Sequence, residues 1–278
     1  MVIAPITIRS TETRTFNGLG CPAEWFLEKQ NPEPGKKVFF IRGNALHTAV
    51  EWYALNGWGA SLNTLVDIAQ TYVEEQLEEA ALLDMDILET SKQKAEGLYV
   101  QADKDVTAWY NQVVAQEVKP YQYLQGTFDA EVVLEVEAPD FHLRTSADAI
   151  FHSAKRGPHV IDWKTGSKSA SDLQLFVYWF AMRDMGMVTN SDVRGWFHYV
   201  AYAQPIAHPY ATYPGDQFMY EYIATAEQRR LSGPYLPTPS FLCNYCLQRG
   251  GCPLYADDQE AACNNIKRSI SFREEEEV

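Results

Sequence analysis

Several features are missing from this sequence, and each absence narrows the class of protein. The 278 residues contain no run of eighteen apolar residues, so no membrane-spanning helix is predicted. The first residues, MVIAPITIRSTETRTF, lack a basic segment followed by an apolar core, so we expect no secretory signal and a cytoplasmic location. Positive charge is scarce: 23 lysine and arginine residues stand against 37 acidic residues, a formal net charge of −14. This balance argues against nucleic-acid binding over the whole surface.

Cysteine is also scarce, with five residues, and in a reducing compartment thiols or metal ligands are expected rather than disulfides. Cys243, Cys246 and Cys252 form the pattern C-x2-C-x5-C, and Cys21 lies far away near the N-terminus. Four thiolates can hold a structural zinc ion or an iron–sulfur cluster, and the spacing alone does not decide between them. Either would close a very long loop and tie the two ends of the chain together. Cys263 falls outside the pattern and is expected to be a free thiol.

The chain has no internal repeat and no long Gly-, Ser- or Pro-rich linker, so it predicts a single α/β domain over residues 1–270. The acidic segment 271–278 is expected to be a solvated tail. Within the domain we expect a helical region at about 44–120, a core at about 127–232 and a cysteine-bearing end at about 240–256.

Hydrophobic periodicity and turn signals divide the chain further. A helix is expected over residues 44–56 with Asn44 as its N-cap, and two or more long helices over 64–118. Three β-type runs joined by turn residues then predict a meander, after which helices and one more strand alternate. The expected segments are strands at 127–138, 141–153 and 158–166, a helix at 169–186, a strand at 192–203 and a helix at 215–231.

The stretch HVIDWKTG, residues 159–166, carries an acid and a lysine on a mostly apolar strand. Successive side chains of a strand point to opposite faces, so Asp162 and Lys164 share a face. The preceding strand carries Asp148, and adjacent antiparallel strands can bring Asp148 beside Asp162. Two neighbouring carboxylates repel each other unless a cation lies between them, and hard oxygen ligands suit Mg²⁺ or Mn²⁺. Lys164 would then lie beside the metal, as metal-assisted hydrolysis of a phosphodiester requires.

Each of these residues also has an ordinary structural interpretation. An Asp–Lys pair on a strand is commonly a solvated ion pair that contributes little stability. Gln174 and Tyr178, four residues apart, project from one face of the following helix, either toward the site or as plain helix surface. His47, on an earlier helix, is either a core or surface residue or a third metal ligand.

Taken together and in order, these residues resemble the RecB-like branch of the PD-(D/E)XK nucleases. The resemblance is closest to the stand-alone CRISPR-associated and phage exonucleases of that branch, in which a four-cysteine iron–sulfur cluster clasps the nuclease domain. The family's helix histidine, aspartate, D/E-x-K pair and Q-x-x-x-Y helix match His47, Asp148, Asp162 with Lys164, and Gln174 with Tyr178. Its cluster cysteines match Cys21, Cys243, Cys246 and Cys252, and a proline follows the first and the last, Pro22 and Pro253.

The resemblance implies a restriction-endonuclease-like core, a mixed sheet flanked by helices, with a helical insertion and a terminal region clasped by a 4Fe–4S cluster. It implies a bound Mg²⁺ or Mn²⁺ whose ligands are His47, Asp148, Asp162 and the backbone carbonyl of Trp163. It further implies that Lys164 positions or activates a water molecule, and that Gln174 and Tyr178 orient Lys164 or contact the DNA backbone.

The chain departs from the family pattern in two ways. Ala147 precedes Asp148 where the family name has a proline, and the overall balance of charge is acidic for a DNA enzyme. We therefore expect the basic residues near the site to gather into a local positive channel; these are Arg42, Lys155, Arg156 and Lys168.

The function these features predict is a metal-dependent DNA exonuclease that acts on single strands or duplex ends in recombination, repair or CRISPR-type processing. Two alternatives stay open: a weakly active or non-catalytic DNA-binding subunit of a recombination or CRISPR-adaptation complex, and a zinc-binding structural protein. Aromatic side chains are expected to stack on unpaired bases, but the sequence offers many candidates and no way to choose. Cleavage polarity and oligomeric state, including a homo-oligomer, are also left open.

Overall fold

A computed structural model describes residues 2–5, 7–30, 35–57, 59–89, 93–115, 128–153, 157–165, 172–188, 194–202, 204–208, 213–240, 243, 246–265 and 270–273. The chain divides into two compact units, which are described separately. The first, here called the sheet unit, comprises Pro34–Val133 and Ser146–Tyr213. The second, the cysteine unit, comprises Met1–Glu33, Leu134–Thr145 and Pro214–Val278. The assignment of one domain to residues 1–270 stays a prediction.

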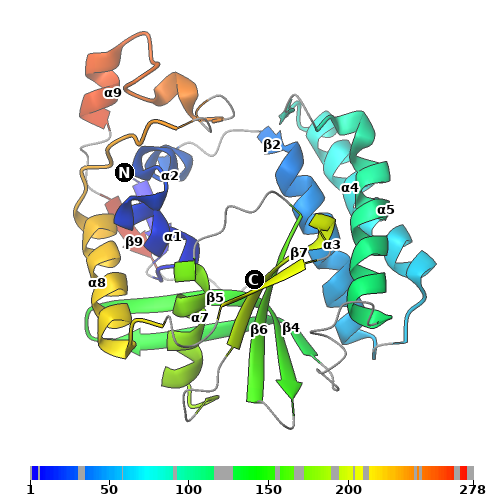
Figure 1. Ribbon diagram of the computed structural model, residues 1–278. Coiled ribbons are helices and arrows are strands. Elements are labelled where there is room, and N and C mark those ends of the chain that lie inside the picture. Colours follow the sequence, from blue (N-terminus) through cyan, green and yellow to red (C-terminus); the bar gives the residue numbers. More distant parts are fainter. Residues whose placement is uncertain are drawn as a thin grey trace. The chain divides into compact units, whose positions relative to one another are not determined.

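Five strands form a mixed sheet in the order β4–β5–β6–β7–β8 (Figure 1). β5 and β6 pair antiparallel, β6 and β7 parallel, and β7 and β8 antiparallel. The bounds are β4 Phe128–Ala138, β5 Phe141–Ser153, β6 Gly157–Lys164, β7 Arg194–Tyr199 and β8 Gln204–His208. The three strands expected before residue 167 therefore form in sequence order, with bounds close to those predicted. β4 and β5 carry the period-2 pattern of a half-buried strand, whereas β6 is a short run that is buried from His159 to Trp163.

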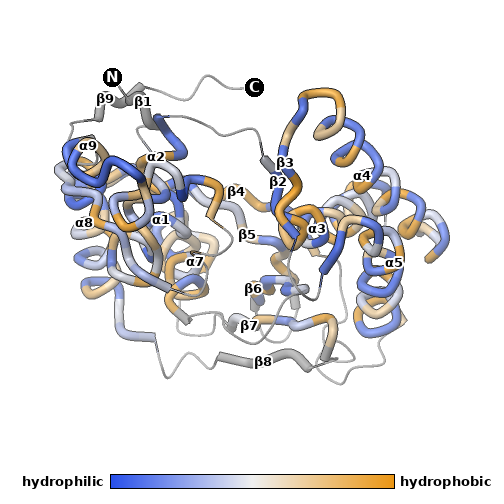
Figure 2. The backbone as a smooth tube through the Cα atoms, turned by 90° about the horizontal axis from the view of Figure 1, so that it is seen from above, coloured by the Kyte–Doolittle hydropathy of each residue, from blue (hydrophilic) through white to orange (hydrophobic). Residues whose placement is uncertain are grey.

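Three helices of the sheet unit pack together against one face of the sheet (Figures 1 and 2). They are α3 (Val38–Leu55), α4 (Leu62–Leu82) and α5 (Leu98–Trp109). Trp109 of α5 lies edge-on to Trp163 of β6, with ring centroids 5.9 Å apart, and edge-on to Tyr53 of α3 at 5.7 Å. The core they share also receives Ala149, Phe151 and Ile161 from the strands. This contact fixes α3 against β5 and β6, the two strands that carry the expected site.

The parallel step from β6 to β7 requires a crossover, and α7 (Asp172–Asp184) supplies it. α7 is buried on almost every side: Leu175, Val177, Trp179, Ala181 and Met182 are all fully buried. A Cβ added at Gly195 of β7 would lie 3.3 Å from the Leu175 side chain, so the helix approaches the sheet closely at this glycine. The helix expected at 169–186 is present as α7. In the described part of the chain, no helix is both long and apolar enough to cross a membrane.

α3 begins at Val38, six residues before the predicted start, so Asn44 lies within the helix and is not its N-cap. Lys37 takes the N-cap position with extended backbone angles, φ −94° and ψ 125°. The first turns, VFFIRG, contain β-branched, aromatic and glycine residues of low helix propensity, which is why the sequence pattern placed the start later. Burial of Val38, Ile41 and Arg42 against the neighbouring helices outweighs that low propensity.

The cysteine unit joins segments that are distant in sequence. Ile8 forms a parallel bridge to Leu143 of β5: its N–H donates to the His142 carbonyl at 2.7 Å, and its carbonyl accepts from Arg144 N–H at 3.0 Å. β1 (Val2–Pro5) pairs parallel with β9 (Ile270–Arg273). The helical segments are α1 (Ser10–Arg14), a following turn η1 (Thr15–Leu19), α2 (Pro22–Gln30), α8 (Asp216–Ser232) and α9 (Gln259–Asn265). Segments from both ends of the chain thus belong to one unit.

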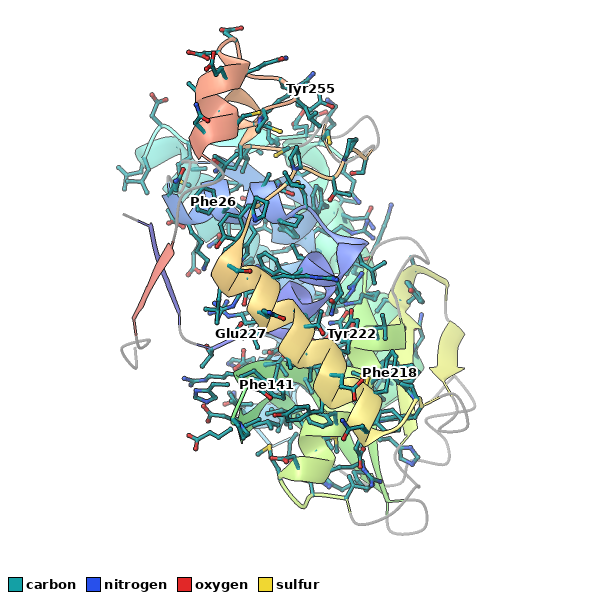
Figure 3. The ribbon with its side chains drawn as sticks, turned by 90° about the vertical axis from the view of Figure 1, so that its left-hand side faces the viewer. Phe26, Phe141, Phe218, Tyr222, Glu227 and Tyr255 are labelled. Carbon is teal, nitrogen blue, oxygen red and sulfur yellow. The ribbon has the colours of Figure 1, made fainter. Side chains whose placement is uncertain are left out.

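An aromatic cluster forms the core of the cysteine unit. Tyr235 stacks on Phe26 with ring centroids 4.4 Å apart, and Trp25 lies edge-on to Phe16 at 4.9 Å. Glu227 lies on α8 (Figure 3). Its carboxylate forms a buried two-bond ion pair with Arg230, at 2.5 and 2.6 Å. Such a buried pair contributes orientation more than net stability, because desolvation of both charges offsets their attraction.

Candidate functional site

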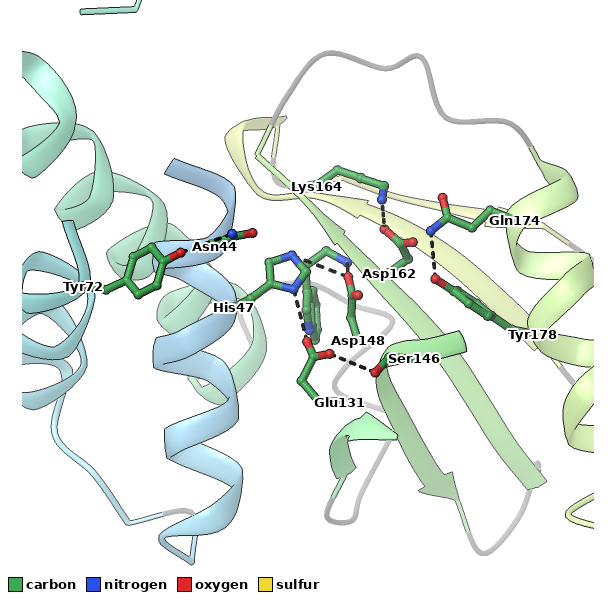
Figure 4. Close-up of polar contacts among 11 residues, drawn as sticks. Asn44, His47, Tyr72, Glu131, Ser146, Asp148, Asp162, Lys164, Gln174 and Tyr178 are labelled. Carbon is green, nitrogen blue, oxygen red and sulfur yellow. Dashed lines mark hydrogen bonds and ion pairs between the residues drawn. The ribbon is translucent and has the colours of Figure 1, made fainter. Parts of the chain in front are cut away.

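The expected site residues of β5 and β6 lie where the pairing of the two strands ends. Ala149 and Ile161 are the last paired residues, and Asp148 and Asp162 each stand one position beyond them. Asp148 Oδ2 accepts a hydrogen bond of 2.7 Å from the Trp163 backbone N–H, which holds this carboxylate against β6 (Figure 4). The Trp163 backbone carbonyl as a metal ligand stays a prediction.

His47 reaches this carboxylate from α3. Its Nε2 atom lies 3.6 Å from Asp148 Oδ2, and the side chain retains 28% of its accessible surface (Figure 4). The packing of α3 against the sheet therefore brings together a helix histidine and a strand aspartate that are about one hundred positions apart in the chain.

Glu131 of β4 is a member of the cluster that the sequence did not reveal. Its Oε1 atom lies 3.3 Å from His47 Nδ1, and its Oε2 atom accepts a hydrogen bond of 2.9 Å from Ser146 Oγ. Ligand atoms of Glu131, His47 and Asp148 all lie within 4.8 Å of one another. Glu131 also has a positive φ of 48°, an uncommon conformation for a non-glycine residue. Because β4 neighbours β5, any acidic residue of β4 could have been considered as a member of the site. The alternation of apolar and polar residues does not show the local change in backbone direction at Glu131, so it could not single this residue out.

Asp162 is completely buried, and neither of its carboxylate oxygens receives a hydrogen bond from the described residues. Its polar contact is an ion pair with Lys164, whose side chain remains 30% exposed. Lys164 also places its ammonium 5.8 Å from the centre of the Phe197 ring. A buried carboxylate is costly unless it is fully paired. Because Lys164 pairs with Oδ1 of Asp162, the Oδ2 atom is the one that fits a bound cation.

Gln174 and Tyr178 of α7 hydrogen-bond to each other, with Gln174 Nε2 donating to Tyr178 Oη at 2.8 Å (Figure 4). Both are buried, with 6% and 2% of their surface accessible. The predicted i, i+4 relation is therefore present, but on a buried face of the helix rather than on its surface.

Charges within the cluster perturb one another. Burial raises the pKa of Asp148 to about 7, and the nearby Asp162 carboxylate adds to the rise against the opposing effect of His47. Burial lowers the pKa of His47, but Asp148, Glu131 and Asp162 together outweigh it and raise the value to about 9. Burial also opposes ionisation of Glu131, yet its contact with His47 prevails and lowers its pKa. Such coupled acids and a histidine are typical of a functional site.

The four patterned cysteines all belong to the cysteine unit. Backbone N–H groups donate to two of the sulfur atoms, from Thr238 to Cys21 Sγ at 3.4 Å and from Ser240 to Cys243 Sγ at 3.3 Å. Burial raises the pKa of the Cys252 thiol, and the neighbouring thiols of Cys21, Cys243 and Cys263 raise it further. The N-terminal cysteine and the C-terminal ones thus lie near enough to interact.

The prediction that Arg42 lines a basic DNA channel is wrong. Arg42 is buried and forms two hydrogen bonds with the Asp105 carboxylate of α5, at 2.6 and 2.9 Å. A guanidinium committed to a two-bond pair inside a helix interface is unavailable to phosphate. Lys155, Arg156 and Lys168 lie outside the described residues.

Carboxylates, an imidazole and a lysine gathered where the strands of a mixed sheet end are the side chains that divalent-metal hydrolases use. The match to a family is more specific. Residues 11–253 match the PD-(D/E)XK nuclease superfamily, and the chain belongs to that superfamily, whose members are metal-dependent nucleases. The expected restriction-endonuclease-like fold, a mixed sheet flanked by helices, is thereby confirmed.

Comparison with solved structures returns, among others, one described as "Crystal structure of SSO0001". It shares 12% sequence identity with this chain at a TM-score of 0.36, and the alignment covers 84% of this chain and 95% of the other. Comparison with curated proteins returns no match.

Proposed function

We propose that this nuclease is a RecB-like DNA exonuclease whose Mg²⁺ or Mn²⁺ is held by His47, Asp148 and Asp162. The observation that carries the proposal is Asp162: its carboxylate is fully buried beside Asp148, Lys164 pairs with Oδ1, and Oδ2 has no hydrogen-bond partner among the described residues. When bound there, a divalent ion supplies Lewis-acid polarisation of the scissile phosphate and a water molecule of lowered pKa.

Lys164 has a role of its own. Its ammonium pairs with Asp162 yet keeps about a third of its side chain accessible, so it can approach a phosphate without leaving the site. A positive charge held at that place stabilises negative charge that develops on the phosphate oxygens, and it can orient the attacking water.

Glu131 orients His47. Its carboxylate accepts from Nδ1, which leaves Nε2 facing Asp148, and Ser146 in turn anchors the carboxylate. A carboxylate on the far nitrogen of a metal-binding histidine fixes its tautomer and ring direction. Gln174 and Tyr178 act as buried support under the site, since their burial leaves little surface for contact with DNA.

For the cysteine unit we propose a structural 4Fe–4S cluster held by Cys21, Cys243, Cys246 and Cys252. The support is the proximity of Cys21 and Cys243 to Cys252, together with backbone N–H donors directed at the sulfur atoms of Cys21 and Cys243. Protein purified without oxygen should be brown, with absorption near ~400 nm, whereas a colourless protein that contains zinc would contradict the cluster.

The nuclease proposal is tested with anaerobically purified protein, end-labelled single- and double-stranded DNA, and Mg²⁺ or Mn²⁺. We expect metal-dependent degradation by the wild type and its loss in Lys164→Ala, and the order of label release gives the polarity. Equal activity in both proteins would indicate a contaminant. No activity in a folded, brown wild type would favour the alternative, a DNA-binding subunit of a larger complex.

A further inference from the structure

Few aromatic side chains of the described chain are largely exposed. They are Phe40, Phe218 and Tyr255, with 58%, 48% and 41% of their surface accessible. Phe218 and Tyr255 belong to the cysteine unit, so Phe40 is the exposed aromatic residue in the described part of the sheet unit. The same unit holds Glu131, Asp148 and Asp162 with His47, here called the carboxylate cluster. An exposed apolar ring does not contribute the burial energy that stabilises a fold, so it is available for contact with another molecule.

Phe40 shares a face of α3 with His47. The two residues are seven positions apart, so they lie two turns and about 10 Å from each other along the same side of the helix. Between them, a Cβ added at Gly43 would lie 3.7 Å from Thr165 Oγ1, so this face is turned toward the end of β6, next to Lys164. The accessible stripe of α3 therefore runs from the carboxylate cluster to the Phe40 ring.

The ring is positioned by its neighbours. Phe39 lies 4.6 Å from Phe40 between ring centroids, at an interplanar angle of 56°, and the Lys37 ammonium lies 5.5 Å from the centre of the Phe40 ring. A cation near an aromatic face is attracted to its π electrons. A ring that is already oriented loses little conformational freedom when a second flat group stacks on it.

We propose that Phe40 is a stacking platform for an unpaired base of the DNA strand whose phosphate occupies the carboxylate cluster. This inference rests on the nuclease function proposed above and names its substrate as single-stranded DNA or a frayed end. Stacking on an aromatic ring tolerates any base, whereas bases inside a duplex already cover each other's faces. In a chain of net charge −14 whose Arg42 is committed to Asp105, an uncharged contact of this kind supplies affinity that phosphate binding alone would lack.

The test compares wild type with Phe40→Leu, which keeps apolar volume but removes the aromatic face, and with Phe40→Trp. Phe218→Ala is the matched control, because Phe218 is also an exposed ring on a helix with a second ring, Tyr222, beside it. Binding is measured by fluorescence anisotropy in Ca²⁺, which suppresses cleavage, with short single-stranded DNA in which one abasic nucleotide is moved along the strand.

We expect Phe40→Leu to raise Kd about tenfold, and the Trp and Phe218→Ala variants to stay close to wild type. Wild type should lose affinity for one particular abasic position, and Phe40→Leu should be insensitive to that position. Equal affinity of Phe40→Leu and wild type, or sensitivity to every abasic position in both, would overturn the proposal. So would a change in oligomeric state of Phe40→Leu by size-exclusion chromatography, since the ring would then contact a second copy of the chain.

Cleavage is assayed in parallel with the same variants and Lys164→Ala. A wild type that cleaves while Phe40→Leu binds normally would refute only the stacking role. A wild type that shows the abasic preference but no metal-dependent cleavage would refute the nuclease proposal and leave the base contact in place.

Discussion

The carboxylate cluster takes each of its residues from a different regular element, namely α3, β4, β5 and β6, and these elements are held by a shared hydrophobic core. The patterned cysteines, in contrast, lie directly before α2 and in the 243–252 segment, among whose described residues the regular element is the short turn η7 (Arg249–Gly251). The side chains of the first site are placed by the packing of these elements on one core. The second site depends on bringing together Cys21 and Cys252, which lie about 230 positions apart in the chain.

The largest effect on cleavage is expected from a substitution of Asp162, whose buried carboxylate lies beside that of Asp148. Asp162→Asn should reduce cleavage by about a thousandfold or more, because one oxygen ligand and the partner of Lys164 are lost. The same change should stabilise the metal-free protein by about 1 kcal/mol, because it removes a buried charge next to Asp148.

Cleavage assays measure the expected loss of activity, and denaturant unfolding in EDTA measures the expected gain in stability. A variant that is both inactive and less stable would show that Asp162 serves the fold rather than a metal site.

In the cysteine unit, substitution of a proposed ligand should lower stability, whereas Asp162→Asn should raise the stability of the metal-free protein. Cys252→Ser should abolish the absorption near ~400 nm and lower stability by several kcal/mol, because the cluster would contribute its binding energy to folding. Cys263→Ser is the matched control, since Cys263 lies near Cys252 but outside the pattern. Iron content, absorption and thermal unfolding are the measurements. Equal behaviour of the two variants would make Cys263 a member of the ligand set or show that no cluster is bound.

Substitutions of Glu131 test whether this residue orients His47 or binds the metal directly. Glu131→Ala should weaken Mn²⁺ binding by about 10- to 100-fold. Glu131→Gln should restore most of the affinity, because an amide can still accept from His47 Nδ1–H and donate to Ser146 Oγ. Mn²⁺ titration followed by electron paramagnetic resonance gives the affinities. Equal losses in both variants would mean that the charge of Glu131 binds the metal directly.

The smallest effect is a pH dependence of the metal-free sheet unit. Asp148 has its pKa raised from 3.8 to about 7, so the folded chain binds more protons than the unfolded chain, and stability falls as pH rises through that range. His47 has its pKa raised from 6.5 to about 9, so its stabilising contribution is complete below 6.5 and is lost as pH rises through 9. Both groups act in the same direction.

We therefore expect the melting temperature in EDTA to be a few degrees lower at pH 9 than at pH 6. Added Mg²⁺ should restore more of it at pH 9, since the ligands must be deprotonated to bind the ion. Asp148→Asn should flatten the profile. A metal-free melting temperature that is constant or rises with pH would contradict the charge arrangement.

Local pattern predicted much of the fold. The strand bounds of β4 and β5 agree with the predicted segments because alternation and turn residues are properties of short windows. The start of α3 was wrong because packing overrides weak helix propensity at Val38 and Ile41. Arg42 was wrong for a related reason: its partner, Asp105, is 63 positions away, and no window of sequence contains both.

By itself, the sequence determined the pairs whose spacing is a property of one element: Asp162 with Lys164 on a strand, and Gln174 with Tyr178 on a helix. Only the tertiary structure decided that Glu131 joins His47, that Arg42 turns inward and that Phe40 stays exposed beside the site. The physical reason is the distance along the chain over which each effect acts. Backbone periodicity acts over a few residues, whereas the packing of α3 on β5 and β6 depends on side chains from the whole sheet unit at once.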